Sequence, residues 1–195
     1  FGILILAGGG SLRFGGEKAL FSVDGKPMIQ HVVERISGLS TEIVISLKSS
    51  KGDLAEMFPG KKIVLDKWDR RGALTGLMSA LPEIKSEYVA LVTCDCPKIN
   101  PEVIKLLLDS AKNHDGAIPR WPNGYVEPLQ AVYKTDKLRE AVESAWGSGK
   151  MRLAAVLEML SDIVYIPTEK LKEVDHILES FLNINSPRDL ARLHW

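Results

Sequence analysis

Two hydrophobic periodicities alternate along this chain. Short runs rich in Ile, Val and Leu, typical of buried strands, are separated by segments in which apolar residues recur at helical spacing. The runs predict strands over residues 2–6, 42–47, 62–65, 88–93, 116–119, 129–133 and 163–166. The helical spacing predicts helices over residues 27–36, 73–81, 100–111, 136–146 and 151–160, with Ser186 capping a final helix. This order predicts a three-layer, Rossmann-like α/β fold in which helices cover both faces of a mostly parallel sheet.

Length and charge narrow the range of partners. The 195 residues suffice for one well-filled core but not for two ordinary domains and a linker, so we expect a single domain over residues 1–195. Lys plus Arg and Asp plus Glu both number 25, so no net charge favours nucleic acid or an anionic membrane. The first apolar run is too short to cross a bilayer and lacks a cleavage signal. We therefore expect a cytoplasmic protein with neither nucleic-acid nor membrane partners.

The two cysteines, Cys94 and Cys96, stand two positions apart at the end of a predicted strand. At that spacing normal disulfide geometry is not available. A zinc site is disfavoured because no second cysteine pair exists and the four histidines lack ligand spacing. We expect buried core thiols in a reducing compartment.

The most informative segment is the glycine-rich loop after the first strand, residues 6–18, with the sequence LAGGGSLRFGGEK. Ligands of open α/β sheets bind beyond the carboxyl ends of strands, where glycines let backbone N–H groups approach phosphate oxygens. Arg13 and Lys18 add positive charge, which suits the charge that develops during phosphoryl transfer. The loop therefore predicts a triphosphate-binding site.

Two better-known glycine loops do not fit this segment. In a P-loop the lysine would stand two positions earlier than Lys18 does, counted from Gly10. A dinucleotide fingerprint that begins at Gly8 would need its third glycine where Arg13 stands. A flexible turn without function remains the structural alternative.

Two carboxylates end predicted strands at the same edge. Asp95, in the sequence CDCP, follows the strand at residues 88–93 and could hold Mg²⁺, which takes one or two protein carboxylates plus substrate phosphates. Asp66 follows the strand at residues 62–65 and could accept hydrogen bonds from a nucleotide, with Asp69 as a rival. Turn capping by Asp95 and solvent exposure of the other two acids are the alternatives.

Further polar candidates lie downstream. Glu127 follows a loop that contains Trp121, and Asn183 and Asn185 alternate with apolar neighbours on a short stretch expected to be extended. On such a stretch both amides face one side, where they could line a pocket. An equally supported alternative is that the asparagines stabilise a turn or cap a helix before Pro187.

Together these motifs resemble the molybdenum cofactor guanylyltransferases. The glycine loop fills every fixed position of that family's signature, and the CDCP, EPL and NINSP segments extend the resemblance over the whole chain. The resemblance implies Mg²⁺ on Asp95 and an acceptor pocket near Glu127, Asn183 and Asn185. The nucleotide-binding residues that it implies are Leu6, Ala7, Gly8, Gly9, Lys18, Ser46, Asp66 and Asp95.

The activity implied by this resemblance is transfer of GMP from GTP to molybdopterin, giving the guanine dinucleotide cofactor and pyrophosphate. The expected catalytic residues, Arg13, Lys18 and Asp95, would act by positioning and electrostatics without a covalent intermediate. The loop over residues 120–127 would accommodate the bulk of molybdopterin. Transient contact with other cofactor-biosynthesis proteins is a further expectation.

One departure from the family leaves the base open. Ser46 stands where the family often has an asparagine that contacts guanine, although a hydroxyl can also donate and accept. The nearest alternative function is therefore transfer of CMP or another nucleotide, or transfer to a sugar phosphate or a cobamide precursor. From another class, a nucleotide-binding regulator without turnover would also retain the glycine loop.

Overall fold

A seven-stranded sheet forms the centre of the computed structural model, which describes residues 1–8, 10–11, 16–48, 54–70 and 72–192. Its strand order is β11-β9-β10-β8-β1-β6-β7. Only β10 is antiparallel to its neighbours, β8 and β9, and the other pairs are parallel. The strands are β1 Gly2–Leu6, β6 Ile43–Leu47, β7 Lys62–Leu65, β8 Tyr88–Thr93, β9 Gly116–Arg120, β10 Ala131–Lys134 and β11 Ile163–Pro167. The predicted mostly parallel sheet is confirmed.

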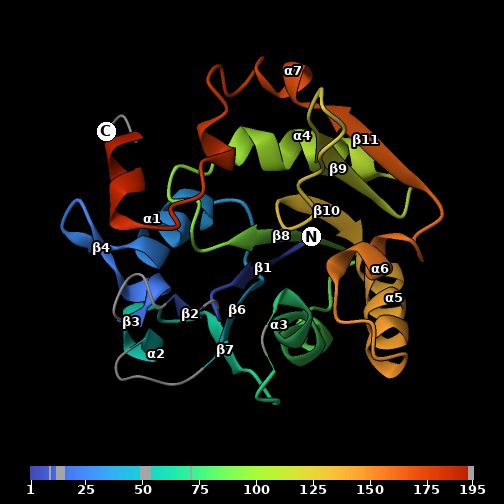
Figure 1. Cartoon of the computed structure of the whole chain (residues 1–195), viewed down its shortest axis with the longest axis horizontal. Coiled ribbons are helices and arrows are strands. Elements are labelled where there is room, and N and C mark those ends of the chain that lie inside the picture. Colours follow the sequence, from blue (N-terminus) through green and yellow to red (C-terminus); the bar gives the residue numbers. More distant parts are fainter. Residues whose placement is uncertain (9, 12–15, 49–53, 71, 193–195) are drawn as a thin grey trace.

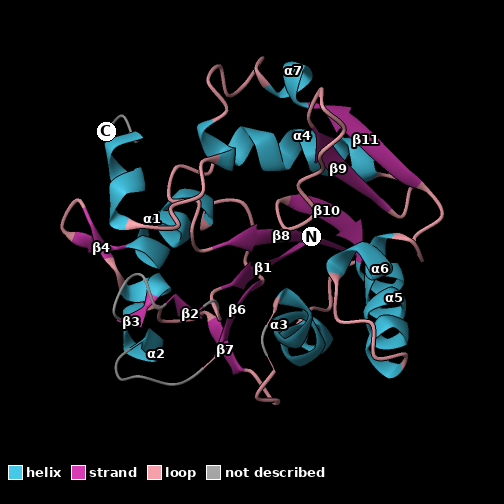
Figure 2. Ribbon diagram, viewed as in Figure 1, coloured by secondary structure: helices cyan, strands magenta, loops and turns pink. Residues whose placement is uncertain are grey.

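Helices cover both faces of this sheet, as Figure 2 shows. On one face lie α1 Met28–Ile36 and α4 Pro101–Ala111; on the other lie α3 Ala73–Ala80, α5 Thr135–Gly147 and α6 Leu153–Leu157. Alternate residues of the central strands supply the two cores: Ile3 and Ile5 of β1 face α1 and α4, whereas Leu4 faces α3. The predicted three-layer architecture is therefore confirmed.

The helix signals in the sequence act as expected in α4. Asn100 stands at the N-cap, where its side chain accepts a hydrogen bond from the backbone N–H of Glu102 at 2.9 Å, and Pro101 occupies the first turn. The side-chain amide of Asn100 also donates to the backbone oxygen of Val174 at 2.7 Å. One residue thus starts a helix and fixes the returning C-terminal segment.

Two predicted helices differ from the structure. The helix expected over residues 151–160 is confined to α6, because Arg152 has an extended backbone and its side chain caps no N–H. The segment after Ser186 forms a 3-10 helix, Pro187–Arg192, instead of an α-helix. The carboxylate of Asp189 accepts hydrogen bonds from the Ser186 hydroxyl and, at 2.8 Å, from the backbone N–H of Ser186. The second of these is the bond of a capping box in which the acidic side chain reaches back to the N-cap residue.

Several short elements carry no periodicity that a sequence pattern could detect. They are the hairpins β2 Gly10–Ser11 with β3 Gly16–Glu17 and β4 Ser22–Val23 with β5 Lys26–Pro27, the helices α2 Leu54–Met57 and α7 Thr168–Leu171, and the 3-10 turns Lys18–Leu20, Leu81–Glu83 and Glu179–Phe181. Within the described ranges, every helix is too short or too polar to cross a lipid bilayer.

The C-terminal segment returns to the carboxyl edge of the sheet after α7. In Figure 1 this red segment passes the end of α4 on its way to the C-terminus. The backbone N–H of Ile184 donates to the backbone oxygen of Asp95 at 2.8 Å, and Ile184 itself is fully buried. The chain therefore closes over the turn that follows β8.

Candidate active site

Asp95 lies in the turn directly after β8, at the carboxyl edge of the central strands. The backbone N–H of Cys94 donates to the oxygen of Leu6 at 3.1 Å, which ties this turn to the end of β1. One carboxylate oxygen of Asp95 accepts a hydrogen bond from Lys18 Nζ at 2.7 Å, and the other accepts one from Thr93 Oγ1 at 2.5 Å. Both oxygens are thus oriented by neighbours at the sheet edge.

Lys18 connects the glycine loop to this turn. It begins the 3-10 turn after β3, and its side chain is 9% exposed. Besides Asp95, its ammonium group donates to Asn185 Oδ1 at 2.7 Å. A buried ammonium is tolerated only with such partners. Three segments distant in sequence therefore meet at one positive charge.

The two asparagines reach this turn from the C-terminal segment, but through different partners. Asn185 contacts Lys18, whereas Asn183 Oδ1 accepts a hydrogen bond from the thiol of Cys96 at 3.0 Å. Leu182, just before them, has an extended backbone, although no paired strand forms in this described segment. The structure nevertheless brings both amides beside Asp95.

A second carboxylate, Asp66, lies beyond β7. Its Oδ1 accepts a hydrogen bond from Ser46 Oγ at 2.9 Å, and Ser46 is fully buried. In this structure Ser46 therefore reaches a ligand only through Asp66. A Cβ on Gly8 would lie 3.0 Å from Asp66 Oδ2, so the glycine lets the loop pass close to the carboxylate. The backbone N–H of Ala7 donates to the backbone oxygen of Ser46, which holds the start of the glycine loop against β6.

Burial sets the acidity of Asp66. Desolvation raises the pKa of its carboxyl, while the Ser46 hydrogen bond and the charge of Lys48 act in the opposite direction. Asp69, the rival candidate, is 94% exposed and pairs with Lys48 at 3.3 Å. Of the two acids, Asp66 is the one that faces the glycine loop.

Glu127 lies on the other side of Asp95. The register pairs Ala131 of β10 with Leu91 of β8, so the connection that precedes β10 lies at the same sheet edge as Asp95. Glu127 Oε1 accepts a hydrogen bond from the indole N–H of Trp121 at 2.8 Å. Burial raises the pKa of the Glu127 carboxyl, and the negative charge of Asp95 raises it further.

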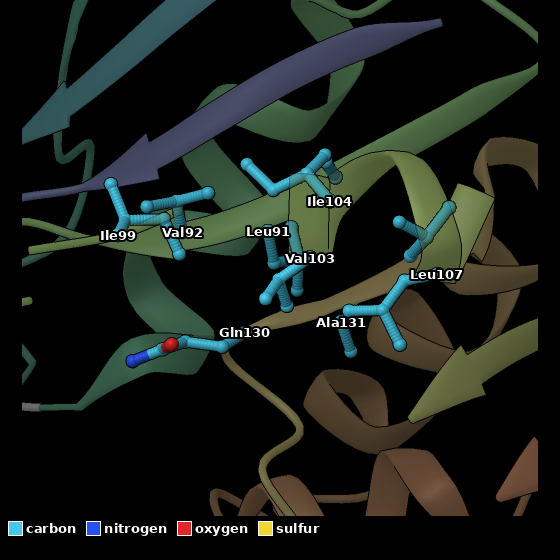
Figure 3. Close-up of a pocket in the computed structure, with 10 residues that line it drawn as sticks. Leu91, Val92, Ile99, Val103, Ile104, Leu107, Gln130 and Ala131 are labelled. Carbon is cyan, nitrogen blue, oxygen red and sulfur yellow. The ribbon is translucent and has the colours of Figure 1, made fainter. Parts of the chain in front are cut away.

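A small internal cavity lies behind the Asp95 turn. Figure 3 shows it between side chains of β8, α4 and the start of β10, with Gln130 the polar side chain among them. Its volume is about 10 Å³, room for about one water molecule and too small for a substrate. Gln130 donates to the thiol of Cys96, while its oxygen is buried without a partner in the described part of the chain.

The donor set suits Mg²⁺ better than a softer metal. Asp95 already holds one cation, the ammonium of Lys18, and Mg²⁺ needs only one or two carboxylates when phosphates supply further oxygens. Across the described ranges, no three His, Cys, Asp or Glu side chains form a metal-binding group. Burial raises the pKa of the Cys94 thiol to about 12 and that of Cys96 well above its ordinary value, which disfavours the thiolate form that a softer metal would need. The residues present therefore fit a magnesium ion shared with a triphosphate.

Two expected site residues, Gly9 and Arg13, lie outside the described residues. The others divide into three positions along one edge. Lys18, Asp95, Asn183 and Asn185 lie at the centre; Leu6, Ala7, Gly8, Ser46 and Asp66 lie toward β7; and Glu127 lies toward β10. Thr93, Cys96 and Gln130 also contact this site but were not predicted as site residues: Cys96 was expected only as a buried core thiol, and nothing in the local sequence marks Thr93 or Gln130.

Known proteins resemble the chain over nearly its whole length. The model of the MobA-like NTP transferase domain matches residues 3–164. A probable molybdenum cofactor guanylyltransferase of Methanosarcina mazei is 34% identical over 97% of this chain and 88% of its own length. The protein of the same description from Pyrococcus horikoshii is 35% identical over 95% of each chain. The crystal structure of molybdopterin-guanine dinucleotide biosynthesis protein A from Archaeoglobus fulgidus superposes with a TM-score of 0.83 at 30% identity, covering 98% of this chain and 96% of that one.

Proposed function

Because the chain belongs to the MobA-like NTP transferase family, we propose that it transfers GMP from GTP to molybdopterin, releasing pyrophosphate. Its full-length relatives described as guanylyltransferases support the choice of nucleotide and acceptor. The structural observation that carries the proposal is the contact of Lys18 with Asp95, which joins the glycine loop to the carboxyl edge of the sheet. The proposed enzyme acts as one domain on small phosphorylated substrates.

In the proposed reaction, an oxygen of the acceptor phosphate attacks the α-phosphorus of GTP. A new P–O–P bond forms, the bond between the α-phosphorus and the α–β bridging oxygen breaks, and pyrophosphate leaves with that electron pair. This substitution needs no covalent enzyme intermediate. The chain must hold both substrates in line and stabilise charge on the leaving group.

Lys18 is suited to the second task. An ammonium group has three N–H donors, and two of them are directed at Asp95 and Asn185 in this structure. A phosphate oxygen could accept the third without removing the lysine from its buried position. Arg13 is proposed to supply a second positive charge from the same loop.

Asp95 is proposed to bind Mg²⁺ together with the phosphates. When bound, the ion supplies Lewis-acid stabilisation of the phosphate oxygens. Thr93 fixes the carboxylate by donating to one of its oxygens, and Lys18 donates to the other. The turn is thus preorganised for a cation.

Asp66 is proposed to bind the guanine edge. A carboxylate can accept hydrogen bonds from N1–H and from the 2-amino group of guanine. The hydroxyl of Ser46 occupies Oδ1 and leaves Oδ2 directed toward the Gly8 position. The missing side chain of Gly8 leaves room for the base.

A radiolabel transfer assay tests this function. The chain is incubated with molybdopterin, Mg²⁺ and GTP labelled at the α-phosphate, and the labelled dinucleotide is separated from GTP. We expect label transfer to be faster from GTP than from CTP, UTP or ATP. Asp95→Asn should lower the rate of transfer from GTP by about 10²-fold or more. Asp69→Asn is the matched control, since Asp69 is an exposed acid at the same edge. No label transfer, or faster transfer from CTP, contradicts the proposal.

A further inference from the structure

The connection between β9 and β10, residues 121–130, presents a fixed surface at the catalytic edge. The backbone N–H of Glu127 donates to the oxygen of Pro119, and the hydroxyl of Tyr133 donates to the oxygen of Pro128 at 2.8 Å. Tyr133 is almost fully buried, so this anchor belongs to the core. The side chains of the connection are therefore held in place before any ligand binds.

One oxygen of Glu127 has no protein partner in the described residues. Trp121 donates to Oε1, whereas no hydrogen bond or ion pair to Oε2 is present among them. Glu127 is half-buried, and a partly desolvated carboxylate oxygen requires donors. A ligand with adjacent N–H groups would supply them.

Flat aromatic side chains border this carboxylate. The ring of Trp121 meets Phe181 edge-on, with centroids 6.0 Å apart and an interplanar angle of 78°, which fixes its orientation. Tyr125 is 60% exposed, and its backbone oxygen accepts a hydrogen bond from the N–H of Trp121 at 2.8 Å. The negative charge of Glu127 raises the pKa of the Tyr125 phenol, in agreement with their proximity. An exposed ring beside a carboxylate suits a flat heterocycle with N–H donors at its edge.

We propose that Glu127, Trp121 and Tyr125 form a subsite for the 2-amino-4-oxopyrimidine ring of a pterin. Its N3–H and 2-amino groups are parallel donors that fit a carboxylate as an arginine fork does, and its ring can stack on the aromatic side chains. This inference rests on the proposed function, which supplies a pterin-containing acceptor.

Guanine presents the same pair of donors, so the subsite must be distinguished from the one at Asp66. The sheet order places β10, β8, β1, β6 and β7 side by side, with Glu127 at one end of this series and Asp66 at the other. Four strand spacings separate the two ends, on the order of 19 Å. One bicyclic ring cannot reach both carboxylates. Lys18 and Asp95 lie between them, where a dinucleotide product would carry its two phosphates.

The carboxylates of Asp66 and Glu127 have similar surroundings. Each is partly buried, and each has one oxygen held by a neighbouring donor, Ser46 for Asp66 and Trp121 for Glu127. The second oxygen of each is without a hydrogen bond from the residues that the structure describes. Two rings with the same donor edge would thus be bound by two similar acceptors on opposite sides of the reacting phosphates.

Fluorescence titration with two small probes tests this subsite. The probes are 6-methylpterin and 6-methyllumazine, which differ in that lumazine has a carbonyl in place of the 2-amino group. We expect the wild type to bind the pterin about tenfold more tightly. Glu127→Gln should remove that preference, and Tyr125→Ala should weaken binding of both probes. Thermal unfolding of each variant checks that the fold is retained.

Asp66→Asn provides the matched comparison. It should weaken GTP binding and leave pterin binding unchanged, whereas Glu127→Gln should do the reverse. Unchanged pterin binding in Glu127→Gln, or loss of pterin binding in Asp66→Asn, overturns the inference. If the pterin preference is found but no GMP is transferred, the proposed function fails and the subsite stands. If GMP is transferred with an unchanged acceptor KM in Glu127→Gln, the subsite fails and the function stands.

Discussion

At the scale of single residues, Ser46 is a buried hydroxyl that orients a carboxylate of the proposed nucleotide site. It is fully buried, and its hydroxyl orients Asp66 at 2.9 Å. A Cβ on Gly76 would lie 2.9 Å from the same hydroxyl, so the glycine is what lets α3 approach Ser46 this closely. If Asp66 binds the nucleotide as proposed, Ser46 would act on it through this carboxylate.

Ser46→Ala tests this indirect role. Removal of the donor frees Asp66 to rotate, and we expect the KM for GTP to rise about threefold to tenfold while pterin binding is unchanged. Ser37→Ala, which removes a hydroxyl bonded to the oxygen of Val33 in α1, is the matched control. Steady-state kinetics at varied GTP give the comparison. An unchanged KM in Ser46→Ala would mean that Asp66 needs no such support.

Glu127 gives a prediction for stability against pH. Burial and the charge of Asp95 raise its pKa in the folded chain, so proton uptake favours the folded state and stability falls as pH rises through that pKa. A glutamine keeps the acceptor for Trp121 but cannot ionise. We expect the Tm of Glu127→Gln minus that of the wild type to increase from pH about 4 to about 7. Glu143→Gln, on an exposed part of α5, is the control for loss of one charge; a difference that shrinks with pH opposes the account.

At the scale of elements, the contact of β9 with β10 depends on a glycine. A Cβ on Gly116 would lie 2.7 Å from the backbone oxygen of Val132 and 2.9 Å from the ring of Tyr133. Because a backbone oxygen in a strand cannot move aside, Gly116→Ala should lower the free energy of unfolding by about 1 to 3 kcal/mol. Gly147→Ala, at the end of α5 with open space around it, should raise it by about 0.5 to 1 kcal/mol. Denaturant unfolding measures both, and equal effects would exclude the steric argument.

The elements that could be predicted are those with enough residues to show a period. The strands at residues 62–65 and 88–93 begin and end where the hydrophobic runs do, and α4 begins at its predicted cap. The helix predicted over residues 151–160 was too long. Apolar residues continue beyond Leu157, where α6 ends, so the hydrophobic pattern did not mark that end. Two-residue strands and single-turn helices are fixed by contacts with the rest of the chain, so local sequence does not reveal them.

At the scale of the whole molecule, the site is a product of strand order. The carboxyl ends of β1, β8, β6 and β7 meet at one edge, which brings the glycine loop, Asp95 and Asp66 together as the sequence predicted for a parallel sheet. The sequence could not show that Lys18 bonds both Asp95 and Asn185, because these pairs are 77 and 167 positions apart. Nor could it show that the antiparallel β10 brings Glu127 to this edge.

The central claim is that Asp95 holds the metal that binds the nucleotide to this edge. Calorimetric titration of GTP, with and without Mg²⁺ and without acceptor, measures it directly. We expect Mg²⁺ to lower the Kd of the wild type for GTP by about tenfold or more, because a cation held by Asp95 would offset the repulsion between its carboxylate and the triphosphate. In Asp95→Asn the effect of Mg²⁺ should be lost, while Asp69→Asn should behave as the wild type. Equal strengthening of GTP binding by Mg²⁺ in the wild type and in Asp95→Asn would contradict the account.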